Sequence, residues 1–365
     1  MAVLVCVGAL IARPLLCIID LPDTVVLTDS EYAADAPLHL TKYLTQKQAD
    51  STVDGNNKKY ITVRLLGIIP VKKVLVNTLP FDTVLIGGIP IGIAGDIDGV
   101  LITADVGELK TGDIVVAING NEIKSEADFN KHTKNKRNVM IIVEHAGKQR
   151  TIEIAEPAEL QVRGTTNGVG VLTFVNPENN NFSALGHQMG DFDTGTSVNL
   201  RGGTVKAVHT FGIEKTEGKR TGVIKSSLRS NSPAQGSITR GDKFGVAGCL
   251  TADSDILRQC TTTMPVATRY NVRAGAAVLR TGLTDNMVEE FECEILKTRY
   301  QNKKADKSMV IRITDKKLLE RTGGILHGMS GSPVIQDGKL VGVLTHATTS
   351  DPAKGYCVYI DFVTI

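Results

Sequence analysis

The part of the chain that follows Pro157 alternates short apolar runs with turns that contain glycine, and it holds no pattern of a long helix. The apolar runs have the length and the β-branched content of strands. They fall at residues 168–175, 202–211, 222–225, 276–280, 290–298 and 309–313. About 200 residues built in this way predict a mainly β architecture of two barrels.

The composition excludes several classes of function. Tryptophan is absent and the net charge is only +2, which argues against base stacking and against nucleic acid as a partner. The six cysteines show neither a CxxC pair nor a cluster at metal-ligand spacing, so we expect no structural zinc. Buried free thiols are the expectation, and a bridge between Cys249 and Cys260 is the alternative.

A serine between glycines is the strongest candidate nucleophile. Residues 328–333 read Gly-Met-Ser-Gly-Ser-Pro, and two apolar runs joined through Asp337-Gly338 follow them as a predicted hairpin. Glycine at 328 and 331 allows backbone angles in which successive N–H groups converge. Ser330 would then be the nucleophile, with the backbone N–H groups of Gly328 and Ser330 as the oxyanion hole.

The order of residues in a chymotrypsin-like peptidase, which fits this size and strand density, is His, Asp and then Ser. His187 lies in a Gly-His-x-x-Gly turn well before Ser330, where its imidazole could take the hydroxyl proton. His209 lies within an apolar alternation and is expected on a strand. His327 would sit on the nucleophile turn itself, and His346 would border the substrate strand.

Residues 79–156 resemble a PDZ domain, because residues 109–120 match the motif L-x-x-GD-x-[IV]-x-x-I-N-G. The resemblance implies that an extended peptide adds to a sheet edge, with Gly92 and Ile93 at the carboxylate loop. A PDZ fold that only packs against its neighbour is the alternative. Residues 125–130 have the composition of a helix start, and residues 139–143 and 151–154 predict a hairpin.

The N-terminal 78 residues are expected to lie outside the folded domains. Residues 1–19 are nearly all apolar and predict a membrane anchor or export signal, with a buried strand or helix as the alternative. Residues 20–78 are predicted to form a connector that contains extended segments, and residues 157–365 to form the peptidase.

The chain is similar to the SpoIVB peptidase family of PDZ-containing serine peptidases, over roughly residues 65–362. The similarity rests on residues 184–187, Asp191 and residues 193–195, on the nucleophile motif, and on the segments 345–346, 351–352 and 355–356. It implies Ser330 as nucleophile, His187 as general base and Asp315 as the acid that orients the imidazole. Asp191 and Asp193, near His187 in sequence, are alternatives for the acid.

The resemblance also implies a biological setting. Such an enzyme is exported to the space between the forespore membranes, cleaves itself in its N-terminal part and needs neither metal nor organic cofactor. It then cuts a regulatory subunit of an intramembrane metalloprotease, which activates the processing of a sigma factor. Two alternatives are a catalytically silent PDZ scaffold at the membrane and a quality-control protease, although there the PDZ domain follows the protease.

Overall fold

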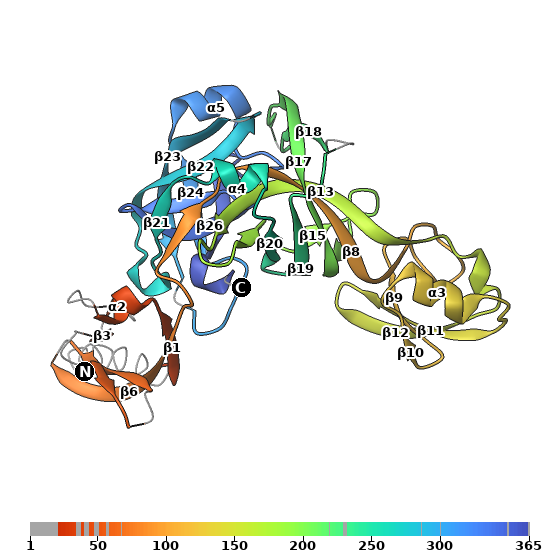
Figure 1. The fold of residues 1–365 in the computed structure, drawn as a ribbon, viewed down its shortest axis with the longest axis horizontal. Coiled ribbons are helices and arrows are strands. Elements are labelled where there is room, and N and C mark those ends of the chain that lie inside the picture. Colours follow the sequence, from red (N-terminus) through yellow and green to blue (C-terminus); the bar gives the residue numbers. More distant parts are fainter. Residues whose placement is uncertain are drawn as a thin grey trace, which may run out of the picture.

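The protein is mainly β and consists of four bodies, each with its own apolar core. A computed structural model describes residues 21–33, 38–39, 44–46, 51–55, 58–66, 68–218, 220–228, 232–285, 287–299, 301–348 and 350–363. Figure 1 shows a small N-terminal sheet at one end, two barrels in the middle and a module of residues 99–162 at the other end.

The first barrel closes from six strands in the order β8, β17, β19, β20, β14 and β13, with β13 pairing back to β8. These strands are β8 (Pro90–Ile102), β13 (Val162–Val175), β14 (Asn181–Ala184), β17 (Leu200–Glu214), β19 (Gly236–Asp242) and β20 (Gly245–Leu250). Ile91, Ile93, Leu172 and Phe182 point inward and are fully buried. Their alternation with smaller or polar neighbours is what a half-buried strand requires.

The second barrel closes from β22, β23, β24, β27, β26 and β25 in that order. Its strands are β22 (Gly275–Thr284), β23 (Met287–Thr298), β24 (Met309–Ile313), β25 (Pro333–Gln336), β26 (Lys339–Ala347) and β27 (Lys354–Tyr359). Leu279, Ile311, Val343 and Val358 fill its interior and have no exposed surface. The prediction of a mainly β, double-barrel fold is therefore confirmed.

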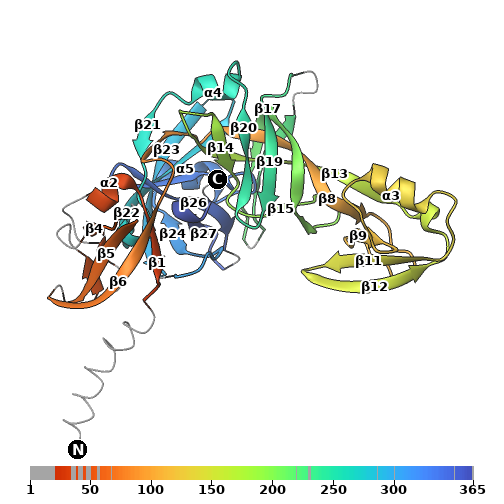
Figure 2. The same cartoon turned by 60° about the horizontal axis from the view of Figure 1, so that its bottom comes forward.

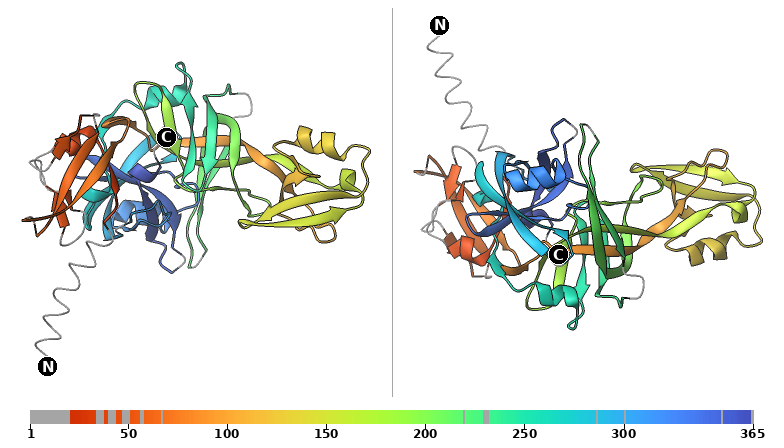
Figure 3. Two further views of the ribbon diagram at one scale, coloured as in Figure 1. Left: turned by 90° about the horizontal axis from the view of Figure 1, so that it is seen from below. Right: turned by 90° about the horizontal axis from the view of Figure 1, so that it is seen from above.

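The module of residues 99–162 is continuous with two strands of the first barrel, β8 and β13. The far end of β8 pairs with β9 (Ile114–Ile118), and the start of β13 pairs with β8 at Ile102. The module adds β10 (Asn121–Glu122), α3 (Glu126–Thr133), β11 (Val139–His145) and β12 (Lys148–Ile154). Ser125 caps α3 by accepting the Asp128 N–H at 3.2 Å, and β11 pairs with β12 as the sequence predicts. Figures 2 and 3 show the module standing away from both barrels.

The structure divides this region differently from the predicted boundaries of 79–156 and 157–365. Residues 90–98 belong to β8 of the first barrel, where they pair with β13 on one side and β17 on the other. The module is therefore an insertion between two strands of one barrel. The sequence does not reveal this, because strand partners far apart in the chain leave no local signal.

The segment expected as a connector forms a small sheet. Its order is β1 (Thr24–Leu27), β6 (Ile69–Thr78), β5 (Lys59–Leu65), β3 (Leu44–Gln46) and β2 (Leu38–His39), with β4 (Ser51–Val53) on β5. Helix α2 (Asp29–Ala33) ties this sheet to the rest of the protein. The buried carboxylate of Glu31 on α2 accepts the Thr268 N–H at 2.8 Å and the Asn271 side-chain N–H at 2.6 Å.

The predicted anchor at residues 1–19 lies outside the described residues. Within the ranges that the structure describes, no helix has both the length and the apolar composition needed to cross a bilayer.

The cysteines that the structure describes are free thiols, as predicted; Cys260, Cys293 and Cys357 are buried, whereas Cys249 is half-buried. Burial raises the pKa of Cys260 and of Cys293 to about 12. These thiols therefore stay protonated at neutral pH and are poor nucleophiles. Cys6 and Cys17 lie outside the described residues.

Candidate active site

The nucleophile turn joins α5 (Lys316–Thr322) to β25 and has the backbone that its glycines predict. Gly328 has a φ of +99° and Gly331 a φ of +100°, which side chains strongly disfavour. A Cβ on Gly331 would lie 2.0 Å from the carbonyl oxygen of Val171. The turn thus packs directly on β13, and the predicted hairpin of β25 and β26 follows it through Asp337-Gly338.

The backbone donors of this turn fall into two groups. Four N–H groups donate to backbone carbonyls at 2.8–3.2 Å: His327 to Gly222, Met329 to Leu326, Gly331 to Leu344 and Ser332 to Met329. Among the hydrogen bonds of the described residues, none is donated by the N–H of Gly328 or of Ser330. These two donors are the predicted oxyanion hole, and they are the ones left available for an anionic oxygen.

The Ser330 hydroxyl is half-buried and donates to the carbonyl oxygen of Thr345 on β26 at 2.7 Å. The hydroxyl is therefore bound to the backbone of β26, one residue before His346, and not to an imidazole. Rotation about one side-chain bond would release the hydroxyl, because among the described residues it is hydrogen-bonded to the Thr345 carbonyl alone.

His187 lies on a second turn that presses against the same strand. Leu185 and Gly186 have φ angles of +68° and +70°, and a Cβ on Gly186 would lie 2.8 Å from Val343 of β26. The half-buried His187 ring stacks against His346, with ring centroids 4.4 Å apart and planes inclined by 37°. The sequence places His346 near the substrate strand but gives no sign of this stacking.

One residue of β13, Val171, joins the two turns. Val171 of β13 donates its N–H to the Ser330 carbonyl at 2.8 Å and accepts the Leu185 N–H at 3.3 Å. The turns of Ser330 and His187 are thus both hydrogen-bonded to one residue of β13. The two turns meet where the barrels meet, since β13 belongs to the first barrel and β25 and β26 to the second.

The hydrogen bond of His187 favours the tautomer that a general base needs. Its Nδ1 lies 2.7 Å from the carbonyl oxygen of Gln188. A carbonyl only accepts, so Nδ1 carries the proton and Nε2 of the neutral ring carries the lone pair. Burial, with smaller contributions from His346 and His327, lowers the pKa of His187 to about 4. The imidazole is therefore neutral, and able to accept a proton, at neutral pH.

The carboxylates expected as the third member have other partners. Asp315 caps α5 by accepting the Leu318 N–H at 2.9 Å. Asp191 and Asp193 bind Arg163 at 2.5 Å and 2.6 Å. Within the described part of the chain, no hydrogen bond or ion pair joins His187 to a carboxylate. The backbone carbonyl of Gln188 occupies the position on Nδ1 that the sequence assigns to an acid.

Gly92 and Ile93, expected at a carboxylate-binding loop, lie instead in the middle of β8. Gly92 pairs with Val169 and Lys206, and Ile93 is fully buried. A strand paired on both edges offers no edge to an added peptide. The prediction for these two residues is therefore wrong, and the reason is the membership of β8 in the barrel.

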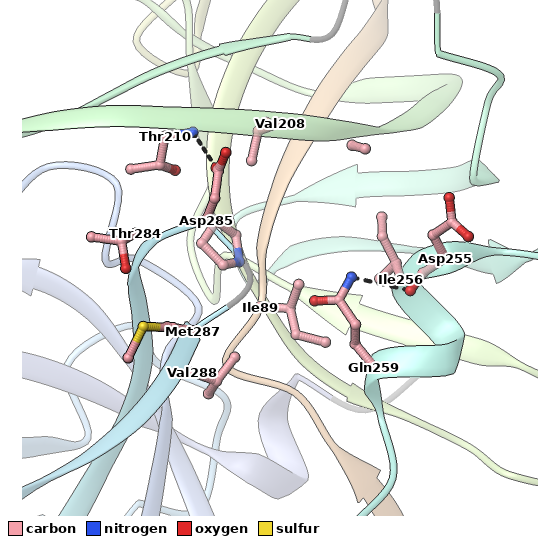
Figure 4. Close-up of a pocket in the computed structure, with 12 residues that line it drawn as sticks. Ile89, Val208, Thr210, Asp255, Ile256, Gln259, Thr284, Asp285, Met287 and Val288 are labelled. Atoms are coloured by element: carbon pink, nitrogen blue, oxygen red, sulfur yellow. Dashed lines mark hydrogen bonds between the residues drawn. The ribbon is translucent and has the colours of Figure 1, made fainter.

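His209 lies on β17, as expected for a strand residue, and pairs with Asp285. Asp285 also lines a cavity of 210 Å³ between β17, helix α4 (Asp255–Gln259) and the hairpin of β22 and β23. Figure 4 shows its apolar lining, which includes Ile256 and Val288, beside the carboxylate of Asp285. Neither Ser330 nor His187 lines this cavity.

The fold and the site define a class of protein. Two six-stranded barrels, with a serine in a glycine turn and a histidine at their junction, are the arrangement of a chymotrypsin-like serine peptidase. Residues 158–364 match the model of the family described as SpoIVB peptidase S55, so the chain belongs to this family and is a serine peptidase of sporulation. A comparison with curated proteins gives no match.

Proposed function

We propose that this peptidase makes a few regulatory cuts, first in its own N-terminal part and then in a membrane-associated protein partner. The observation that carries the catalytic part is the pair of N–H groups at Gly328 and Ser330 that donate to no other described residue, next to a histidine whose tautomer suits a base. The setting, with an N-terminal anchor and an extracytoplasmic location, rests on the family and on the apolar residues 1–19.

The proposed chemistry passes through an acyl-enzyme. The Ser330 hydroxyl turns from Thr345 and attacks the scissile carbonyl as Nε2 of His187 takes its proton. The N–H groups of Gly328 and Ser330 stabilise the negative oxygen of the tetrahedral intermediate. His187 then gives the proton to the leaving amine, and a water molecule repeats the sequence to release the acid. The Thr345 carbonyl, once vacated, is placed to accept an N–H from the substrate chain.

The proposed partner is the regulatory subunit of an intramembrane metalloprotease, whose cleavage would start sigma-factor processing. The module of residues 99–162 would present either that partner or the protein's own N-terminal region to the barrels. Its place as an insertion into the catalytic barrel supports a role in delivery, since it is attached through two continuous strands, β8 and β13.

N-terminal sequencing of the purified protein beside its Ser330→Ala variant tests this proposal. We expect one or a few defined new N-termini in the wild type and none in the variant. Equal processing of the two proteins would contradict the catalytic assignment. Broad degradation of unfolded casein by the wild type would instead favour a quality-control protease.

A further inference from the structure

A hairpin of the first barrel reaches across to the nucleophile turn of the second. It consists of the far half of β17 and of β18 (Val223–Leu228), which pair from Val208 with Leu228 to Glu214 with Val223. Ile224 of β18 is only 5% exposed and lies in the core of the second barrel rather than of the first. The hairpin thus extends a strand of the first barrel and contributes a side chain to the core of the second.

Strand β18 holds the peptide that precedes Gly328. The Ile224 N–H donates to the His327 carbonyl at 2.9 Å, and the His327 N–H donates to the Gly222 carbonyl at 2.8 Å. Val223 and His327 form a parallel bridge, and a Cβ on Gly328 would lie 3.2 Å from Cβ of Ile224. No other described segment accepts from or donates to the backbone of His327.

The tip of the hairpin is itself fixed on α5. The Thr216 N–H donates to the Thr322 carbonyl at 2.8 Å, and the Lys215 ammonium donates to the Glu320 carbonyl at 2.7 Å. These are carbonyls of the last turn of a helix, which lack partners within the helix. The Thr216 hydroxyl in turn accepts the Gly222 N–H at 2.9 Å. The hairpin that contains β18 is therefore anchored on α5, which stabilises the contact between β18 and His327.

The geometry of a trans peptide gives this contact a catalytic consequence. The carbonyl of one residue and the N–H of the next point in opposite directions across the peptide plane. Because β18 binds the His327 carbonyl, the Gly328 N–H must point away from β18. A peptide next to a glycine would otherwise rotate easily, since glycine tolerates both orientations.

We propose that β18, through Gly222 and Ile224, is the positioning element that keeps the Gly328 N–H turned toward the oxyanion. This inference rests on the proposed function, because it assumes that Gly328 supplies one of the two oxyanion donors. It predicts that damage to the β18 contact lowers stabilisation of the tetrahedral oxygen and leaves substrate binding in the ground state intact.

Two variants with matched controls test the inference. Thr216→Val removes the acceptor of the Gly222 N–H, whereas Thr216→Ser keeps it. Ile224→Pro removes the donor to the His327 carbonyl, whereas Ser226→Ala removes a side-chain hydrogen bond to Thr210 farther along the same strand. For each variant, kcat, KM and the affinity for a peptide aldehyde and for the matching peptide amide are measured, with thermal melting to verify folding.

We expect Thr216→Val to lower kcat and aldehyde affinity by the same factor of about threefold to tenfold, with KM and amide affinity unchanged. Ile224→Pro should lower both by about a hundredfold or more, which is the size expected for the loss of one oxyanion donor. Thr216→Ser and Ser226→Ala should behave as wild type.

Unchanged aldehyde affinity in folded Thr216→Val would overturn the inference, as would equal losses of aldehyde and amide affinity. If Ile224→Pro does not fold, Thr216→Val decides alone. A wild type that neither hydrolyses peptides nor binds the aldehyde would overturn the proposed function itself, which is a distinguishable result.

Discussion

The two turns that carry the proposed catalytic residues are held in different ways. Ser330 and Gly331 are fixed by backbone hydrogen bonds to β13 and β26, each at 2.8 Å. Among the described residues, the turn of His187 has one backbone bond to β13, at 3.3 Å, and its ring is positioned by the Gln188 carbonyl and by stacking on His346. The turn of the proposed nucleophile is thus held by two backbone hydrogen bonds, whereas the ring of the proposed base depends also on the packing of another side chain. Substitutions should therefore act on the two turns unequally.

The largest effect should come from the catalytic pair itself. Ser330→Ala and His187→Ala should each lower turnover on the order of a million-fold, since the two groups act as one unit. Hydrolysis of a defined peptide and self-cleavage of the expressed protein measure this loss. Ser237→Ala, at an exposed position on β19, is the matched control and should keep full activity. Activity retained in Ser330→Ala would show that another residue is the nucleophile.

The second effect tests the rigidity of the nucleophile turn. Gly331→Ala places a Cβ 2.0 Å from the Val171 carbonyl oxygen at a φ of +100°. It should destabilise the protein by more than about 2 kcal/mol and lower turnover at least about a hundredfold. Gly338→Ala, where φ is +71° and no atom lies within 4 Å, should cost only about 1 kcal/mol and spare turnover. Equal losses in urea unfolding of the two variants would contradict this difference.

The third effect concerns the turn of the base. Because the pKa of His187 is lowered to about 4, kcat/KM should fall only as the pH drops through about 4, where the ring becomes protonated. His346→Ala removes part of the cover and one source of positive charge, so the acid limb should move up toward the ordinary histidine pKa. A pH profile of kcat/KM, recorded for the wild type and for His346→Ala, measures the acid limb of each protein. An unchanged limb in His346→Ala would mean that the stacking has no electrostatic role.

The smallest effect separates two roles for Asp315. As the cap of α5 it can be replaced by asparagine, so Asp315→Asn should keep turnover within a fewfold of wild type. Asp315→Ala should lower the free energy of unfolding by about 1 kcal/mol. If Asp315 instead orients the imidazole, Asp315→Asn should lower turnover by about ten-thousand-fold. Steady-state kinetics of the two variants therefore decides between cap and acid.

The sequence predicts those parts of the fold that depend on neighbouring residues. The glycine turn around Ser330, the hairpin after it and the capped helix at Ser125 all follow from local backbone preferences. The stacking of His346 on His187 could not be predicted, because it depends on how β26 lies against a turn far away in the chain. The role of the Gln188 carbonyl was missed because backbone acceptors have no signature in a sequence.

The placement of β8 has a practical consequence for work with parts of this protein. The family match begins at residue 158, whereas β8 ends at Ile102. A fragment cut at that match would lack the strand that pairs with both β13 and β17. Two long strands would then expose unpaired edges, which invite pairing between molecules. Such a fragment should aggregate, and soluble production of the peptidase should require residues 90–102 with the inserted module.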